Sequence, residues 1–331
     1  MTIATASRPG RAQRMRAAVL AAPGRVELDE VPIPEPGPGQ VRVRVAGCGL
    51  CGSNLPPFEG RPWFTYPFAP GAPGHEGWGI VDALGPGVVA LCEGDHVATL
   101  GGSAFAEYEA VDAASSVKLP PALAGRPFPG EPLACAVNVF RRSGIAAGQT
   151  VAVVGVGFIG AVLVGLAARA GARVIAVGRR PFALDLARRM GAAAAVELGE
   201  VWPTFERVRA EAGGKLLDVA VEAVGLEAPL ELAGELVRER GRLVIAGYHQ
   251  DGRRSVNLQS WNWRGIDVVN AHERDPAIYA EGMRLAVDAV VEGRLDLAPL
   301  VTHRFPLDRI GDAFAAMRDR PDGFMKAWVA P

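Results

Sequence analysis

Three short segments of the chain carry the kinds of side chain that bind metal ions. The first holds Cys48 and Cys51, the second His75 and Glu76, and the third Glu131 and Cys135. Zinc accepts a thiolate, an imidazole and a carboxylate in a tetrahedral shell, and an open fourth position makes the ion a Lewis acid. Taken singly, a cysteine is more often a small buried hydrophobe, a histidine a satisfied core or surface group, and Glu131 a helix cap. Together, the three segments predict one metal centre.

A glycine-rich motif follows the apolar run at residues 151–154. Gly155, Gly157 and Gly160 allow a sharp turn, a close approach of backbone to a pyrophosphate, and tight packing of the next helix on the strand. That helix begins near Phe158 and Ile159, where free N–H groups and a partial positive charge face the phosphates. The strand before the motif, the helix after it and a second strand at 173–177 together predict a dinucleotide-binding site.

The end of the second strand predicts which dinucleotide binds. NAD-binding versions of the motif place an acid there, about 20 residues on, to accept hydrogen bonds from the ribose 2′-OH. This chain has Gly178 at that position, followed by Arg179 and Arg180. Guanidinium groups form charge-assisted bonds with a 2′-phosphate, which a carboxylate would repel. The alternative is that both arginines are solvated residues at the start of a surface helix, but the missing acid favours NADP(H) over NAD(H).

Composition narrows the class of protein. The length of 331 residues predicts about two domains, and an apolar share of 49% with 41 glycines suits a turn-rich α/β protein. The net charge of −1 provides no positive potential that would attract nucleic acid or anionic lipid. No apolar stretch is long and uninterrupted enough to span a bilayer. Four cysteines indicate a reducing compartment, so the cytoplasm is the expected location. Residues 1–14 are typical of a disordered leader.

Two patterns of secondary structure divide the chain. Short β-type runs at residues 16–20, 40–45, 79–83, 95–99 and 106–111 predict an antiparallel, barrel-like domain. Later strands, at 151–155, 173–177, 193–196, 219–222, 242–247 and 267–270, alternate with helices and predict a doubly wound parallel sheet. Helices are expected at 182–191 and 276–292. A final strand at 325–329 is expected to rejoin the first domain.

The order of these motifs resembles the medium-chain dehydrogenase/reductase superfamily, of the zinc alcohol and polyol dehydrogenase type. The resemblance rests on Cys-Gly-Ser at residues 51–53, Gly-His-Glu-Gly at residues 74–77 and the nucleotide motif, and it covers nearly everything from Met15 onward. It implies an α/β fold with a GroES-like antiparallel β-barrel catalytic domain, residues 15–137 and 274–331, and a doubly wound Rossmann domain, residues 138–273. It also implies a homodimer or homotetramer formed through edge strands, here expected within residues 261–270.

The same resemblance implies the zinc ligands. They would be Cys51, His75 and Glu131, with water or substrate oxygen in the fourth position. Glu76 is an exchange ligand or a support of the shell, and Cys135, which shares a helix face with Glu131, is a reserve ligand. The four-cysteine lobe that binds a structural zinc in relatives is missing, because residues 99–108 connect directly where it would insert. One zinc at most is therefore expected.

The chain departs from the family's pattern at two positions. Asn54 stands where an acid usually orients the metal-bound histidine, and an amide there is expected to lower zinc affinity by about tenfold. Pro56 stands near the place of a relay histidine and carries no proton. The alcohol proton would then pass to Ser53, and from there to ribose hydroxyls or water.

The expected reaction is reversible hydride transfer between NADP(H) and a secondary alcohol or ketone, that is, an NAD(P)-dependent alcohol dehydrogenase or ketone reductase. A carboxylate as third ligand resembles the polyol dehydrogenases of this superfamily, and this resemblance implies a polyol, sugar or cyclitol as substrate. The residues expected to line the nicotinamide pocket end strands at the carboxyl edge of the sheet, and they are Ala223, Val224, Gly225 and Gly247. For the aromatic residues Trp63, Phe64, Tyr66, Phe68 and Trp78, cleft wall and plain core are both open. For His249, His272, Glu273 and Arg274, contact with substrate or cofactor and a surface role are both open.

Two other functions are compatible with the motifs. A zinc-free reductase on the same fold would reduce a quinone or enone with NADPH, and Asn54 and Pro56 suit that alternative. More distantly, the chain would bind NADPH without catalysis, because a fold does not dictate a function.

Overall fold

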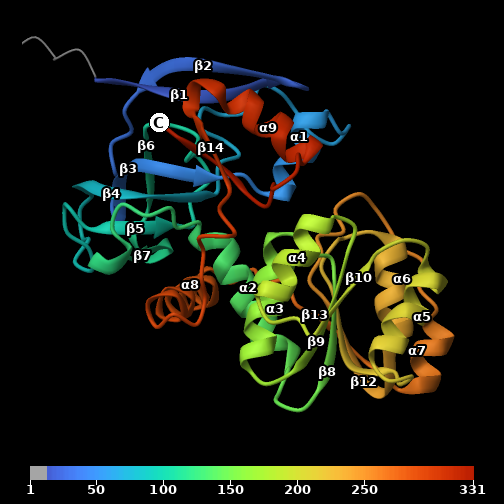
Figure 1. Cartoon of the computed structure of the whole chain (residues 1–331). Coiled ribbons are helices and arrows are strands. Elements are labelled where there is room, and N and C mark those ends of the chain that lie inside the picture. Colours follow the sequence, from blue (N-terminus) through green and yellow to red (C-terminus); the bar gives the residue numbers. More distant parts are fainter. Residues whose placement is uncertain (1–12) are drawn as a thin grey trace, which may run out of the picture.

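The computed structural model describes residues 13–331, so the expected leader at residues 1–14 lies almost entirely outside the described residues. Two large sheets, a separate two-stranded hairpin and the helices around them account for the ordered elements (Figure 1). Among the described residues, no helix combines the length and the apolar character needed to cross a membrane.

The second half of the chain forms a six-stranded parallel sheet in the order β10-β9-β8-β11-β12-β13. Its strands are β8 (Thr150–Val154), β9 (Arg173–Gly178), β10 (Ala194–Glu197), β11 (Leu217–Glu222), β12 (Val237–Ile245) and β13 (Asp267–Asn270). The helices are α2 (Gly130–Ser143), α3 (Phe158–Arg169), α4 (Pro181–Arg189), α5 (Val201–Glu211), α6 (Glu227–Leu236) and α7 (Leu258–Arg264). This strand order reverses between β8 and β11, as in dinucleotide-binding folds. The predicted doubly wound sheet is confirmed.

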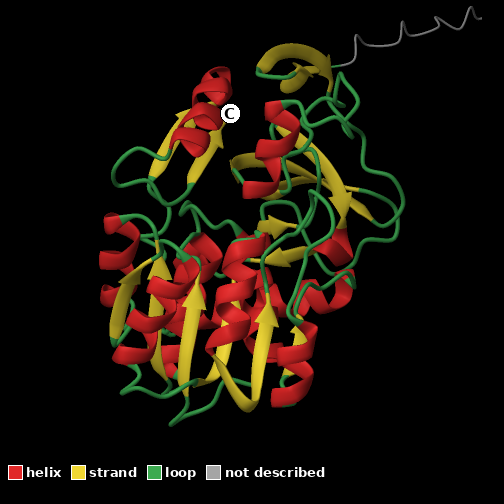
Figure 2. Cartoon of the chain, turned by 90° about the vertical axis from the view of Figure 1, so that its right-hand side faces the viewer, coloured by secondary structure: helices red, strands yellow, loops and turns green. Residues whose placement is uncertain are grey.

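Helices cover both faces of this sheet because its strands are apolar on both faces (Figure 2). On β8, Val151 and Val153 face a core that includes α2, α3 and α4. Ala152 and Val154 face a second core with α5, α6 and Trp261 of α7. Because successive side chains of a strand point to opposite faces, each strand contributes apolar residues to both cores.

The first part of the chain forms a seven-stranded, mainly antiparallel sheet that the C-terminus completes. Its strands are β3 (Gln40–Gly49), β4 (Glu76–Leu84), β5 (His96–Thr99), β6 (Tyr108–Asp112), β7 (Ser116–Lys118), β14 (His303–Pro306) and β15 (Ala327–Ala330). A separate hairpin pairs β1 (Arg14–Ala22) with β2 (Arg25–Pro32), and the remaining helices are α1 (Leu55–Glu59), α8 (Pro276–Val291) and α9 (Ile310–Asp319). Single 3-10 turns lie at Gly52–Asn54, Ala113–Ser115, Pro121–Leu123 and Leu307–Arg309. Because β15 pairs with β3, the last strand rejoins the first domain as predicted.

One expectation needs correction, and several elements were not predicted. The edge segment at residues 261–270 is not one strand, because Leu258–Arg264 forms helix α7 and only Asp267–Asn270 pairs with β12. Trp261 is 7% exposed and packs under the sheet, and this burial outweighs the β propensity of its aromatic neighbours. Strands β2 and β14 and helix α9 were not predicted. In the case of β2, the strand is largely exposed and lacks the alternation of a half-buried strand.

A buried acid lies in the core of the first sheet. Glu109 of β6 is 2% exposed, and its Oε1 accepts a hydrogen bond of 2.5 Å from the hydroxyl of Thr99. Burial raises the pKa of Glu109 from 4.5 to about 7, although the Thr99 hydrogen bond opposes the shift. Between about pH 4.5 and pH 7, the Glu109 carboxyl is therefore protonated in the folded protein and ionised in the unfolded chain.

We expect Glu109→Gln to flatten the pH dependence of stability. The raised pKa stabilises the wild type below about pH 4.5, and this contribution is lost as the pH rises through about 7. The difference in free energy of unfolding between variant and wild type should therefore change by roughly 3 kcal/mol in favour of the variant from pH 4.5 to pH 8. Urea unfolding at several pH values measures it, with exposed Glu93→Gln as control. Parallel curves for wild type and Glu109→Gln would contradict the assignment.

Candidate active site

Pairing of two strands brings Cys51 next to His75. Strand β3 ends at Gly49, strand β4 begins at Glu76, and these two residues are partners in the antiparallel ladder. Cys51 follows the end of β3 by two residues and His75 directly precedes β4, so both emerge at one edge of the sheet. The possible ligand atoms of Cys51, His75 and Glu76 all lie within 4.8 Å of one another.

A peptide carbonyl orients the imidazole of His75. The ring Nδ1 lies 2.9 Å from the carbonyl oxygen of Pro73, which leaves Nε2 free to face Cys51. Asn54 is buried and supports this arrangement, because its Nδ2 donates to the same Pro73 oxygen at 3.1 Å and its Oδ1 accepts from the Cys51 N–H at 2.8 Å. An outer hydrogen bond of this kind fixes the tautomer and direction of a metal-ligating histidine. The missing acid at position 54 therefore has a physical substitute in the backbone.

Helix α2 brings Glu131 and Cys135 to the same site. Glu131 lies in the first turn of α2 and Cys135 one turn later, on the same face. Neither belongs to the close group of three, but the negative charge of Glu131 acts on His75. Burial raises the pKa of Glu131 to about 6, with His75 opposing the shift, and burial raises the pKa of Cys135 to about 12. Cys135 is therefore a neutral thiol beside Glu131.

Tyr279 is a site residue that the sequence did not indicate. It lies on α8, which packs against α2, and its hydroxyl interacts with Glu131 and Cys135. Burial and the charges of these two neighbours raise the pKa of Tyr279, so the phenol stays protonated and can donate a hydrogen bond. No motif in the sequence surrounds Tyr279, and only the packing of α8 on α2 brings it here.

Acidic side chains surround the imidazole of His75. Desolvation disfavours the imidazolium, but the hydrogen bond with Cys51 and the charges of Cys51, Glu131 and Glu76 outweigh it and raise the pKa of His75 to about 10. A thiol, an imidazole and two carboxyl groups around one point match the donors that zinc prefers. Their mutual charge also fits a divalent cation, which would displace the proton from His75.

Glu76 is held by a buried ion pair. Its side chain is fully buried, and Nζ of Lys326 lies 2.8 Å from its Oε1 and 2.6 Å from its Oε2. Lys326 directly precedes β15 and also donates to the carbonyl oxygen of Leu50 at 3.1 Å. Its Nζ lies 4.6 Å from the centroid of the Phe158 ring, at the start of α3. Lys326 thus contacts both Glu76, one of the three clustered ligand-type residues, and Phe158, next to the glycine-rich loop.

The three glycines of the nucleotide motif have the geometry that their predicted roles require. Gly155 has φ +108, and a Cβ there would meet the backbone of Ala223 at 2.9 Å. A Cβ on Gly160 would lie 1.9 Å from the Gly155 oxygen, so this glycine permits close packing of α3 on β8. Gly157 has open space beside it, where a pyrophosphate could approach the backbone. Phe158 and Ile159 follow as the first residues of α3.

Strand β9 ends at Gly178, as the sequence analysis expected, and its last residues pair with β10. Arg179 is exposed in the loop that follows, and Arg180 is half-buried at the N-terminal cap of α4. Arg180 is not simply solvated, because its Nη1 donates a hydrogen bond to the carbonyl oxygen of Phe324.

Glu222 organises the predicted nicotinamide end of the cleft. Buried at the end of β11, it accepts hydrogen bonds from the N–H groups of Val224 at 2.6 Å and Gly225 at 2.7 Å. Gly247, at the end of β12, packs so closely that a Cβ would meet the Gly225 nitrogen at 2.3 Å. The predicted residues Ala223, Val224, Gly225 and Gly247 therefore form one turn pair at the carboxyl edge of the sheet.

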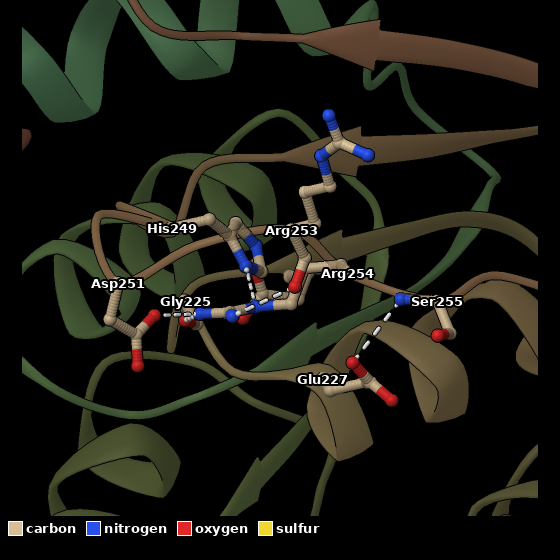
Figure 3. A network of polar contacts seen from close by, with 8 residues as sticks. Gly225, Glu227, His249, Asp251, Arg253, Arg254 and Ser255 are labelled. Atoms are coloured by element: carbon tan, nitrogen blue, oxygen red, sulfur yellow. Dashed lines mark hydrogen bonds and ion pairs between the residues drawn. The ribbon is translucent and has the colours of Figure 1, made fainter.

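His249 is engaged within the protein. Its Nε2 lies 3.0 Å from Oε2 of Glu222, and its Nδ1 accepts from Nε of Arg254 at 3.0 Å. Arg254 also bonds Asp251 and the carbonyl oxygen of Gly225 (Figure 3). Both ring nitrogens of His249 are thus used to hold the loop after β12, which favours positioning of this loop over direct contact with a ligand.

The segment after β13 also serves local structure. The ring of His272 stacks on Tyr248 with centroids 6.2 Å apart, and Glu273 accepts from the backbone N–H groups of Arg274 and Asp275 ahead of α8. Of the aromatic residues, Trp78 is core: it is 5% exposed and its ring lies 5.3 Å from that of Trp328. Trp63 is half exposed and lies beside Phe64.

Comparison with known proteins agrees with this geometry. Residues 37–121 match the alcohol dehydrogenase GroES-like domain, and residues 159–288 match the zinc-binding dehydrogenase family. The chain is 30% identical over 351 residues to 5-exo-hydroxycamphor dehydrogenase of Pseudomonas putida, covering 92% of this chain and 96% of the relative. The chain belongs to the zinc-dependent medium-chain dehydrogenase/reductase superfamily.

Other relatives extend along the whole chain. An alcohol dehydrogenase of Cupriavidus necator is 28% identical over 378 residues, covering 96% of this chain and 99% of the relative. A zinc-binding dehydrogenase of Sinorhizobium meliloti 1021, solved bound to NADP, has a TM-score of 0.81 and 28% identity over 96% of this chain and 100% of that chain. The GroES-like and Rossmann folds are thereby confirmed, and the protein is an NAD(P)-dependent enzyme of the alcohol dehydrogenase type.

We expect Lys326→Met to destabilise the fold strongly, because it leaves the Glu76 carboxylate buried without its partner. The loss should be about 3–5 kcal/mol in the free energy of unfolding. The double variant Glu76→Leu with Lys326→Met should recover much of it, since an apolar pair has no charge to desolvate. Urea unfolding followed by circular dichroism measures both, and Lys118→Met, at an exposed pair with Asp95, should change little. Equal effects of the two lysine variants would contradict a special role for Lys326.

Proposed function

We propose that this protein is a zinc-dependent oxidoreductase that transfers a hydride between NADP(H) and a secondary alcohol or ketone. The observation that supports this most is the convergence of Cys51, His75 and two carboxylates next to the glycine-rich loop. Cys51, His75 and Glu131 would hold the ion, because the Glu76 carboxylate is already paired with Lys326. Glu76 would then exchange onto the ion only when that pair loosens.

A bound zinc ion would supply Lewis-acid polarisation of the substrate oxygen. The chain's own residues position the reaction. Pro73 and Asn54 orient His75, and the Tyr279 hydroxyl, protonated beside Glu131, directs this carboxylate. Ser53 lies half-buried on the turn between Cys51 and Asn54, where its hydroxyl would take the alcohol proton. The Gly225 and Gly247 turns would hold the nicotinamide ring against this point, a gain of positioning.

The substrate class follows from the relatives and the donor set together. Relatives of this chain are named 5-exo-hydroxycamphor dehydrogenase and sorbitol dehydrogenase, and the alcohols in these names are a ring alcohol and a polyol. A polyol, sugar or cyclitol is therefore the substrate class that we propose.

Metal content provides the first test. We expect about one zinc per chain in the purified protein and loss of alcohol oxidation on chelation. Cys51→Ser and Glu131→Gln should lose the metal, with kcat/KM at least roughly 100-fold lower, because several kcal/mol of transition-state stabilisation go with it. Cys92→Ser, at an exposed cysteine outside the site, should keep both. A metal-free protein that reduces enones or quinones at full rate would instead establish the zinc-free reductase.

Cofactor preference provides the second test. We expect kcat/KM to be higher with NADPH than with NADH, because Gly178 offers no carboxylate and Arg179 is free to bind a phosphate. Arg179→Ala should lower kcat/KM for NADPH by roughly 10- to 100-fold, the worth of a hydrogen bond to a charged group, and leave NADH nearly unchanged. Steady-state kinetics with both cofactors measure this, and a clear preference of the wild type for NADH would refute the assignment.

A further inference from the structure

Arg320 has a backbone conformation that arginine rarely adopts. It follows the last residue of α9, with φ 47 and ψ 63 in the left-handed region, and its N–H donates to the carbonyl oxygen of Ala316 at 2.8 Å. Glycine is the usual residue at such a helix end, because a Cβ disfavours this conformation. Gly60 and Gly144 fill the corresponding positions after α1 and α2. An arginine here is therefore unexplained by helix termination.

The side chain of Arg320 lies near two other arginines. Arg180 donates a hydrogen bond to the carbonyl oxygen of Phe324, in the turn that directly follows Arg320. Burial lowers the pKa of Arg180, and the charges of Arg320 and Arg179 lower it further. Burial and the charge of Arg179 lower the pKa of Arg320 in the same way. Three guanidinium groups thus repel one another around the loop that follows Gly178.

This charge has no ion-pair partner among the described residues. Within residues 13–331, none of the ion pairs includes Arg179, Arg180 or Arg320. Two other arginines are paired at short range: Arg309, directly before α9, with Asp312, and Arg318, within α9, with Asp319. Three mutually repelling cations without an acid are costly unless an anion joins them.

We propose that Arg320 completes the binding site for the 2′-phosphate of NADP(H), together with Arg179 and Arg180. This inference rests on the proposed cofactor preference and extends it to a residue outside the nucleotide-binding sheet. A phosphate monoester carries a charge near −2 and several acceptor oxygens, which suits several guanidinium donors. Because α9 packs with the seven-stranded sheet while Arg179 and Arg180 follow β9, the phosphate would connect the two domains. Bound NADP(H) would thereby contact residues of both domains.

The variant Arg320→Gly tests this without endangering the fold, since glycine suits the left-handed conformation. Calorimetric titration of the full chain with 2′,5′-ADP should show an affinity at least roughly tenfold lower than that of the wild type. The affinity for 5′-AMP, which lacks the 2′-phosphate, should stay within about twofold of the wild-type value. The melting temperature should not fall, because the strained backbone is relieved.

Arg318→Gln is the matched control, because it removes one positive charge from the same helix outside the cluster. It should leave the affinity for 2′,5′-ADP almost unchanged. Equal weakening by Arg318→Gln and Arg320→Gly, or no weakening by the latter, would overturn the role of Arg320. So would inorganic phosphate that binds as tightly as 2′,5′-ADP, since the cluster would then be a free-anion site.

The two proposals fail differently. If the wild type binds 2′,5′-ADP no more tightly than 5′-AMP, the preference for NADP(H) is wrong and Arg320 loses its role with it. If the wild type discriminates between the two nucleotides and Arg179→Ala abolishes this, but Arg320→Gly does not, only the role of Arg320 is wrong. Discrimination lost in both variants supports the two-domain site.

Discussion

The ion pair between Glu76 and Lys326 connects the group around His75, the C-terminal strand and the start of helix α3. Both side chains are buried, where a charge is stable only beside its opposite. Glu76 begins strand β4 at the metal-type group, and Lys326 introduces strand β15, bonds the carbonyl of Leu50 and lies over the Phe158 ring of the nucleotide loop. Separating the two charges would leave each buried without a partner, so the pair holds the start of β15 against β4, beside the Phe158 ring.

The C-terminal segment contributes more to the cleft than its sequence suggests. It carries Tyr279 beside Glu131, Lys326 beside Glu76, and Arg320 beside Arg180. None of these residues belongs to a recognisable motif. Each acts on a residue that does belong to one, and each reaches it because α8, α9 and β15 return to pack on the first domain and on α2. The motifs contain the reactive groups, and residues of α8, at the end of α9 and directly before β15 contact and position them.

Charge of opposite sign gathers at two separate places in the molecule. Around His75 a thiol and two carboxyl groups raise its pKa to about 10, a set of donors suited to a cation. At the other place, Arg179, Arg180 and Arg320 present positive charge without acids, which suits a phosphate. Between them lie the neutral glycine turns of Gly155 and Gly225, where backbone approaches backbone too closely for any side chain. A metal ion would bind at the acidic group around His75, and the phosphate of a dinucleotide would bind at the arginine cluster.

The sequence by itself determined the two-domain α/β architecture, the nucleotide loop and the grouping of Cys51 with His75, because these depend on local periodicity, on glycine conformation and on the adjacency of β3 and β4. It also indicated Gly178 at the end of β9, since strand length sets that position. Tertiary structure alone decided that Pro73 replaces the missing acid beside His75 and that residues 258–264 are helical. It also decided that Tyr279 lies beside Glu131 and that Arg320 lies near Arg180. These contacts join segments far apart in the chain, and a side chain's partner across such a distance depends on packing rather than on the pattern of its neighbours.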